Sequence, residues 1–268
     1  MRHRHRISRT GMPAVLFLGL AAAACAPVAE EEWVPLFNGR DLTGWTIKIS
    51  GLELGEDPRE TVRVEDGLLT VSYENYDEFG DRFGHLFYEE PFSDYQLRVE
   101  YRFIGTQAAG APGWAFKNNG VMFHSQSPES MLLDQAFPLS IEAQLLGGNG
   151  TDERPTANVC TPGTEIEIGG VRAENHCTSA SAPTIHGEEW VTMDLIVRGD
   201  SLVAHVMNGD TVMAYGHLTV GGGTVEEFGE AAREEGSPLA HGYIALQCES
   251  HPIQFRQILL KRLSPSRN

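Results

Sequence analysis

The feature that most constrains the fold of this chain is the alternation of apolar and polar residues along several runs. Residues 95–103, 191–197 and 202–206 each place an apolar side chain at every second position. Successive side chains of a β-strand point to opposite faces, so each run has one apolar face. These runs therefore predict strands that cover a hydrophobic core with one face only.

Turn signals separate the predicted strands. Asp66-Gly67 and Asn208-Gly209 each lie between two apolar runs, and such pairs adopt the positive φ that tight antiparallel hairpins require. Only residues 225–235 have the pattern of a short helix, whereas residues 147–188, rich in Gly, Pro, Asn and Thr, indicate an ordered insertion that shapes one rim. The sequence predicts an all-β sandwich of two packed antiparallel sheets with few short helices.

Residues 1–24 have the pattern of a secretory signal peptide, with four arginines before an apolar run that is shorter than the roughly 20 residues of a spanning helix. The run ends in a sequence that resembles the bacterial lipoprotein cleavage box. We therefore expect lipidation of Cys25 and a tether at residues 25–35; ordinary cleavage at an Ala-x-Ala site is the alternative. The expected protein is an exported periplasmic or outer-membrane lipoprotein, held to the membrane only by this anchor, with a domain at residues 36–264.

The net charge of the chain is −17, and loss of the arginine-rich signal would make it more negative. A strongly negative surface repels phosphate backbones. Nucleic acid is therefore excluded as an expected partner.

The chain has four cysteines. With Cys25 assigned to lipid, we expect a disulfide between Cys160 and Cys177, because an exported protein meets an oxidising compartment. Cys248 lies in an apolar run, which favours a buried thiol.

The run at residues 139–146 contains the first candidate for chemistry. If Ile141 and Ala143 face the core, Glu142 and Gln144 lie side by side on the opposite face. A carboxyl group beside an amide can accept a proton and bind a hydroxyl group. The alternative is a solvated outer face with no function.

Two further runs place polar side chains at strand ends. Residues 114–125 run from Trp114 to His124. Trp114 could stack on a sugar ring or simply pack in the fold. His124 is equally consistent with a catalytic residue and with a hydrogen-bonded core residue. Residues 242–251 end in Glu249 and His251, and for His251 a surface loop position is favoured.

A metal site is weakly indicated. His124, His176 and His186 could join Glu142 as ligands, but neither an HxH nor an HExxH spacing is present. The sequence also contains no Gly-x-Ser-x-Gly elbow, phosphate loop or dinucleotide fingerprint, so serine hydrolases and Rossmann dehydrogenases lose their main support.

Three motifs together resemble the 3-keto-disaccharide hydrolase domain family, over roughly residues 36–263. They are Trp33-Val34-Pro35-Leu36-Phe37-Asn38-Gly39-Arg40-Asp41-Leu42-Thr43-Gly44-Trp45, Ile141-Glu142-Ala143-Gln144-Leu145-Leu146, and Ile244-Ala245-Leu246-Gln247 with Ile253-Gln254-Phe255-Arg256. The resemblance implies a jelly-roll sandwich similar to concanavalin-like lectins, in exported bacterial enzymes that cleave glycosides oxidised at C3.

The resemblance also implies site residues. Glu142 and Gln144 match the family's Glu-x-Gln strand, and Arg256 matches an arginine near its C-terminus. The chain departs from the family at Cys248-Glu249-Ser250, where many members have Asp-His-Gly, and at Gln257, where an asparagine is usual.

These residues suggest a mechanism. A ketone at C3 acidifies the C2 proton, so a base can remove it while the C1 substituent leaves, and water can then add. We expect Glu142 as general acid/base and His124 as a second candidate or a metal ligand. A divalent metal, Arg256 or a histidine would stabilise the enolate.

Substrate binding is expected from four polar side chains and one aromatic ring, with a carbohydrate as the partner: Gln144, Gln247, Glu249, Arg256 and Trp114. Two other functions remain open. One is a non-catalytic carbohydrate-binding module. The other is a conventional glucanase in which Glu142 and Glu249 are the two carboxylates.

Overall fold

The computed structural model describes Met1 and residues 32–222 and 234–264. The predicted signal peptide, Cys25 and most of the predicted helix at residues 225–235 lie outside these residues. No helix in the described ranges is both long and apolar enough to cross a membrane.

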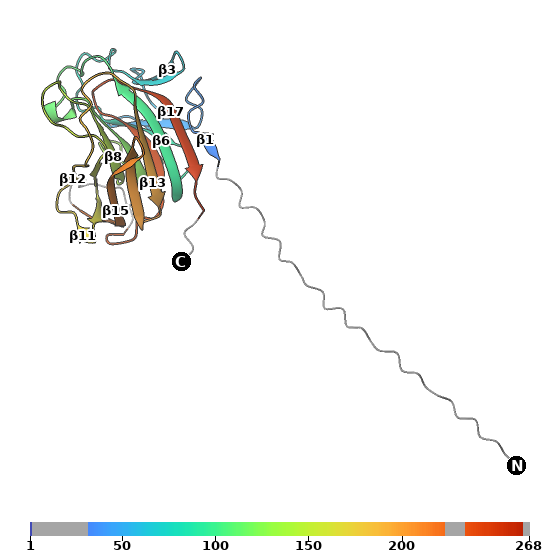
Figure 1. The fold of residues 1–268 in the computed structure, drawn as a ribbon. Helices are drawn as coiled ribbons and strands as arrows, with labels where there is room; N and C mark the ends of the chain where they lie inside the picture. The colour runs from blue at the N-terminus through green and yellow to red at the C-terminus, as the bar shows by residue number, and fades with distance from the viewer. Residues whose placement is uncertain (2–31, 223–233, 265–268) are drawn as a thin grey trace. The chain divides into compact units, whose positions relative to one another are not determined.

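The described chain forms two antiparallel sheets that pack face to face (Figure 1). The ten-stranded sheet has the order β11 (Val171–Arg172), β10 (Thr164–Ile168), β15 (Asp210–Val220), β14 (Leu202–Met207), β13 (Val191–Arg198), β6 (Asp94–Phe103), β17 (Ile253–Arg262), β4 (Leu68–Val71), β3 (Val62–Glu65), with β1 (Trp33–Pro35) also paired to β17. The all-β sandwich expected from the alternation is confirmed.

The seven-stranded sheet carries the features described in the next section. Its order is β12 (Cys177–Thr178), β9 (Asn158–Cys160), β8 (Ile141–Leu146), β7 (Asn118–Ser125), β16 (Tyr243–Cys248), β5 (Gly84–Tyr88), β2 (Trp45–Ile49). Two short 3-10 helices, η1 (Gly113–Ala115) and η2 (Pro128–Ser130), are the helical elements of the described ranges.

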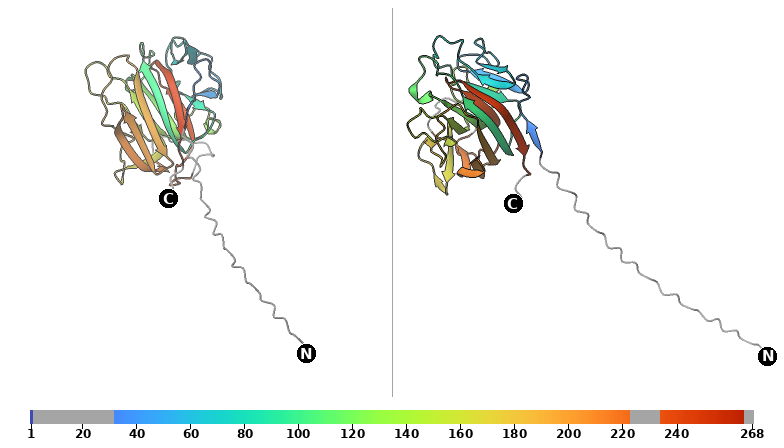
Figure 2. Two further views of the ribbon diagram at one scale, coloured as in Figure 1. Left: turned by 45° about the vertical axis from the view of Figure 1, so that its right-hand side comes forward. Right: turned by 45° about the horizontal axis from the view of Figure 1, so that its top comes forward.

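The core lies between the sheets and is built by the predicted alternation. On β6, Tyr95, Leu97 and Val99 are buried, whereas the intervening residues are half-exposed. β6 pairs with β13 on one side and β17 on the other, as the green, orange and red arrows of Figure 2 show. The hairpin turns at Asp66-Gly67 and Asn208-Gly209 have the positive φ that was expected.

One expected boundary changes. Residues 33–35, placed in the predicted tether, form β1 and pair with β17, so they belong to the folded sheet. The insertion at residues 147–188 contributes short edge strands to both sheets. The disulfide between Cys160 and Cys177 is present and links β9 to β12, and Cys248 is a buried thiol without a disulfide partner in the described ranges.

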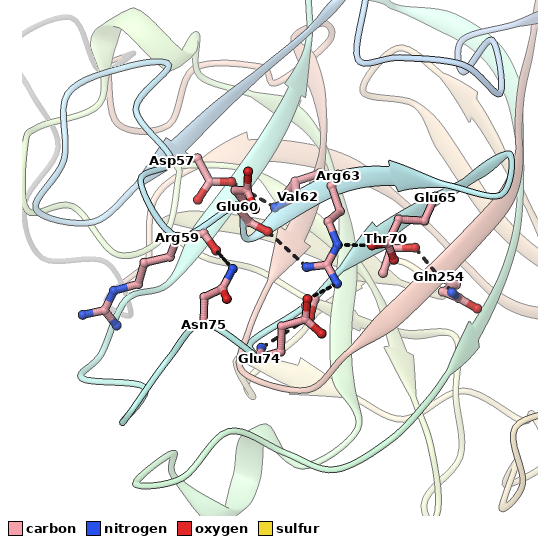
Figure 3. Close-up of polar contacts among 11 residues, drawn as sticks. Asp57, Arg59, Glu60, Val62, Arg63, Glu65, Thr70, Glu74, Asn75 and Gln254 are labelled. Carbon is pink, nitrogen blue, oxygen red and sulfur yellow. Dashed lines mark hydrogen bonds and ion pairs between the residues drawn. The ribbon is translucent and has the colours of Figure 1, made fainter.

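Ion pairs stabilise the β3 edge of the ten-stranded sheet (Figure 3). Arg63 contacts Glu65 and Glu74, each at 2.5 Å. Asp57 accepts a hydrogen bond from the backbone N–H of Val62 at 2.9 Å. Charged side chains on an edge strand oppose pairing with another sheet, so this cluster has a structural explanation.

Candidate functional site

A hollow of about 280 Å³ lies on the outer face of the seven-stranded sheet, the face turned away from the core. β8, β9 and the ends of β7 and β16 supply its floor, and loops form its walls. Its lining consists of Trp114, Asn118, Phe137, Glu142, Gln144, Cys160, Pro162, His176, Cys177 and Glu249.

Strand periodicity and register bring the floor residues together. Ile141, Ala143 and Leu145 of β8 are buried in the core, so Glu142 and Gln144 face outward. Glu142 pairs with Cys160 of β9, and Gln144 lies opposite Gly120 of β7. The expected adjacency of Glu142 and Gln144 is confirmed, but Glu142 is only 6% exposed, so the reading of a solvated face is wrong.

Gly120 makes room for the Glu142 side chain. A Cβ atom at position 120 would lie 2.5 Å from Glu142 Oε1 and 2.6 Å from its Cγ. The glutamate therefore leans across β7 towards β16, over the one position of this part of β7 that has no side chain.

Gln144 is held by two asparagines that sequence reasoning missed. Its Nε2 donates to Asn118 Oδ1 at 3.2 Å, and its Oε1 accepts from Asn158 Nδ2 at 3.1 Å. Asn158 is in turn oriented by the backbone N–H of Ala180, 2.9 Å from its Oδ1. Because both ends of the amide are bound, Gln144 presents a fixed polar group to the hollow.

Glu249 joins Glu142 in the hollow from the end of β16. It is 2% exposed, and Gln247 Nε2 donates to its Oε1 at 3.4 Å. Within the described residues, Glu142 Oε1 and Glu249 Oε2 have no hydrogen-bond partner. Two buried carboxyl groups thus point unsatisfied atoms into one cavity.

The electrostatics of this pair keep a proton in the site. Burial raises the pKa of Glu142 to about 8. Burial and the charge of Glu142 raise the pKa of Glu249 well above its usual range, and Arg154 opposes this shift. Because two neighbouring carboxylates in a dry cavity cannot both ionise easily, the pair retains at least one proton at neutral pH.

Arg154 was not expected from the sequence. Its guanidinium donates to the carbonyl oxygens of Trp114, Phe116, Lys117 and Gly147, which ties the η1 loop to the site. Its charge also acts on Glu249. A single arginine in a loop has no local signal, and only the fold reveals its proximity to a carboxyl group.

Trp114 forms part of the rim. Its ring is 54% exposed and stacks on Phe83 with a centroid separation of 5.8 Å and an interplanar angle of 10°. The disulfide Cys160–Cys177 supplies the opposite wall. An apolar rim around polar groups is typical of sites that bind small molecules, and an exposed aromatic ring suits a sugar face.

Three other sequence candidates lie elsewhere. His124 is buried near the far end of β7, roughly 13 Å along the strand from Gly120, with its Nε2 3.0 Å from the Gly199 carbonyl oxygen. Arg256 is on the outer face of the ten-stranded sheet, paired with Glu100 and 4.6 Å from the Trp190 ring centroid. His251 is buried rather than on a surface loop, between Phe103 and Phe116.

The expected metal ligands are not assembled. His176 lines the hollow with Glu142, but His186 accepts a hydrogen bond from the Gly150 N–H, and His124 lies near Gly199. In the described part of the chain, the one group of three with ligand spacing is Cys160, His176 and Cys177, whose sulfurs form the disulfide. The described residues therefore do not bring His124, His186 and Glu142 together at one point.

Glu142→Gln should increase the stability of the protein at neutral and alkaline pH. The pKa of Glu142 is raised from 4.5 to about 8 on folding. The neutral carboxyl therefore favours the native state fully below pH 4.5, and this contribution is lost as pH rises through 8. We expect a gain of roughly 3 kcal/mol at pH 7, measured by urea unfolding from pH 4 to 9. Glu129→Gln, at an exposed carboxyl, is the control; equal pH profiles for both variants would contradict the prediction.

Gly120→Ala should displace the Glu142 carboxyl without disrupting the fold, because the new methyl group occupies its place. A shifted carboxyl is less completely buried, so the pKa of Glu142, about 8 in the unaltered protein, should fall towards its usual value. Gly113→Ala is the matched control, since a Cβ there has no atom within 4 Å. Thermal unfolding and the pKa of Glu142, the latter by NMR titration, would be measured together, and an unchanged pKa in Gly120→Ala would contradict the displacement.

Comparison with solved structures shows the same fold. Two presumed glycosyl hydrolases from Parabacteroides distasonis match with a TM-score of 0.50, at 19% identity over 87% of this chain and 94% of the first, and at 16% identity over 87% of this chain and 100% of the second. A Bacillus subtilis protein with a galectin-like fold also matches with a TM-score of 0.50, at 13% identity over 88% of this chain and 96% of that protein.

Among curated proteins, none matches this sequence. The family model of the 3-keto-alpha-glucoside-1,2-lyase-like domain matches residues 32–261, which is most of the chain.

Proposed function

Because this chain belongs to the 3-keto-alpha-glucoside-1,2-lyase-like family, we propose that it is an enzyme that cleaves glycosides carrying a ketone at C3 of the sugar. Carbohydrate-related function follows from the family. The oxidised substrate is proposed from the description of the family, and the single observation that carries the proposed reaction is the buried pair of Glu142 and Glu249.

The two carboxyl groups are suited to different steps. The charge of one carboxylate opposes ionisation of the other, so the pair holds one proton beside one carboxylate. We assign the carboxylate to Glu142 and the proton to Glu249. Glu142 is then the base that removes the C2 proton, which the C3 ketone makes acidic. The C–H electrons form a C2=C3 bond and the carbonyl electrons move onto the C3 oxygen, which gives an enolate. The enolate then re-forms the C3 ketone while its C2=C3 electrons form the C1=C2 bond, the C1–O bond breaks, and Glu249 donates its proton to the leaving oxygen. Addition of water to the unsaturated sugar completes a net hydrolysis.

Neighbouring groups support binding of one sugar ring. Gln144, fixed by Asn118 and Asn158, and Gln247 provide amides for hydroxyl groups. Trp114 offers an aromatic face at the rim. The proposal does not use His124 or Arg256, since neither lies at the hollow.

The same pair favours one alternative, a conventional two-carboxylate glycosidase acting on unoxidised sugar. A binding module without catalysis is less well supported. Carbohydrate recognition needs no buried carboxyl pair, and burial of two ionisable groups destabilises the folded state.

The purified protein should convert a 3-keto-glucoside and leave the matched unoxidised glucoside intact. Glu142→Gln and Glu249→Gln should each lower kcat by about 100-fold or more, since each removes a proton-transfer group, whereas Glu129→Gln should be active. Product formation would be followed by NMR. Equal turnover of the unoxidised sugar would indicate the conventional glycosidase, and turnover of neither substrate would overturn an enzymatic role.

The kcat/KM for the keto-sugar should rise with pH up to about 8, where Glu142 ionises in the free protein. It should fall again at higher pH as Glu249 loses its proton. In Glu249→Gln the alkaline decline should disappear while the residual activity still rises with pH. A flat profile from pH 6 to 9 in the unaltered protein would contradict these roles.

A further inference from the structure

His85 on β5 is a buried residue that the proposed roles above leave unexplained. Its side chain is fully buried, and within the described ranges neither ring nitrogen has a hydrogen-bond partner. A buried polar group without a partner destabilises the folded state, so such groups are rare unless another molecule satisfies them.

His85 lies on the same outer face of the same sheet as the hollow. It pairs with Gln247 of β16 on one side and with Lys48 of β2 on the other. Val121 pairs with Leu246, which brings Gly120 next to Gln247, and Gly120 pairs with Gln144. One row across the sheet thus runs from Gln144 through Gly120 and Gln247 to His85 and Lys48.

The separation along this row suits one sugar ring. Glu142 leans over Gly120, so its carboxyl group lies above β7. β5 is two strand spacings from β7, roughly 10 Å. A ring placed above Gln247 would have Glu142 on one side and His85 on the other, and Gln247 Oε1 is itself without a hydrogen-bond partner in the described chain.

Phe137 separates His85 from the hollow. Its half-buried ring lines the hollow and packs edge-on against the imidazole, with a centroid separation of 5.9 Å. The residue lies in the loop between η2 and β8, and contact between the imidazole and a molecule in the hollow requires this one side chain to move.

The surroundings make His85 a neutral hydrogen-bond donor. Burial and the positive charge of Lys48 lower the pKa of His85 to about 3. Lys48 itself is held by the carbonyl oxygens of Ile49, Leu52 and Leu133, at 2.8 to 3.0 Å. A neutral imidazole can donate one N–H to a bound molecule. The nearby ammonium group of Lys48 favours negative charge on the atom that accepts this hydrogen bond.

We propose that His85 binds the oxygen at C3 of the sugar and stabilises it as the ketone becomes an enolate. The inference rests on the proposed function, because abstraction of the C2 proton moves negative charge to that oxygen. It supplies the partner that neither Arg256 nor His124 can provide from its position. Glu142 takes the proton at one side of the ring while His85 holds the developing oxyanion at the other.

His85→Phe tests the proposal with a ring of similar shape and no polar atoms. Because the imidazole has no partner, this variant should unfold at the same temperature as the unaltered protein or higher. Its kcat for the 3-keto-glucoside should fall by about 100-fold or more, as for loss of an oxyanion donor. His85→Gln keeps an N–H donor and should recover part of the lost rate, and His85→Leu should behave as His85→Phe.

His205 is the matched control, because it is also a buried strand histidine but has both nitrogens bonded. Its Nδ1 lies 2.8 Å from the Ala157 carbonyl oxygen and its Nε2 2.8 Å from the Tyr215 hydroxyl. His205→Phe should therefore lower the unfolding temperature, in contrast to His85→Phe.

The outcomes separate this inference from the proposed function. One outcome is that the unaltered protein turns over the 3-keto-glucoside and that folded His85→Phe or His85→Leu keeps kcat within threefold. This outcome would overturn the role of His85 and leave the proposed function intact. If His85→Phe loses rate and His85→Gln does not recover any of it, the result would also contradict a hydrogen-bond donor role for His85. Absence of turnover in the unaltered protein would overturn both.

Discussion

The burial of two carboxyl groups in one hollow is the constraint on which the site depends. Glu142 and Glu249 are removed from water, and each retains an oxygen without a hydrogen-bond partner among the described residues. Such a pair is tolerated only because a large core between two extended sheets stabilises the fold around it. The destabilising arrangement is also the useful one, since it keeps a proton beside a potential base near neutral pH.

Around this pair, the outer face of the seven-stranded sheet has chemically different parts. Glu142 leans from β8 over β7, and Glu249 follows β16. The amides of Asn118 and Gln144 line the hollow, and on β2 and β5 the cation of Lys48 lies beside the neutral His85. Gly120 is essential to this arrangement because the absence of its side chain allows Glu142 to lean across the sheet. The Cys160–Cys177 disulfide and Arg154 hold the surrounding loops, so the rigid sheet presents the polar groups in fixed positions.

Sequence reasoning identified some site residues and misplaced others, for physical reasons. Glu142 and Gln144 were expected because they alternate with core residues on a strand, whereas Gln247 and Glu249 were expected from the polar cluster that ends an apolar run. His124 and Arg256 were chosen by residue type and motif, but His124 lies near the end of β7 that is far from Gly120, and Arg256 lies on a strand of the other sheet. Asn118, Asn158, Arg154 and His85 carry no local signal that separates them from ordinary polar residues.

The sequence by itself predicted several strands, the hairpin turns and the face on which their side chains lie, because these follow from period two and from short-range backbone preferences. The disulfide was expected from the assignment of the cysteines and from an oxidising compartment. Only the tertiary structure decided which strands are neighbours. β8, β7, β16 and β5 come from distant parts of the chain, and their order and register set which outward side chains meet. The face on which a side chain lies is a local property of its strand, whereas its neighbours across the sheet depend on strand pairing. The presence of Glu142, Glu249 and His85 on one face of one sheet therefore follows from the fold alone.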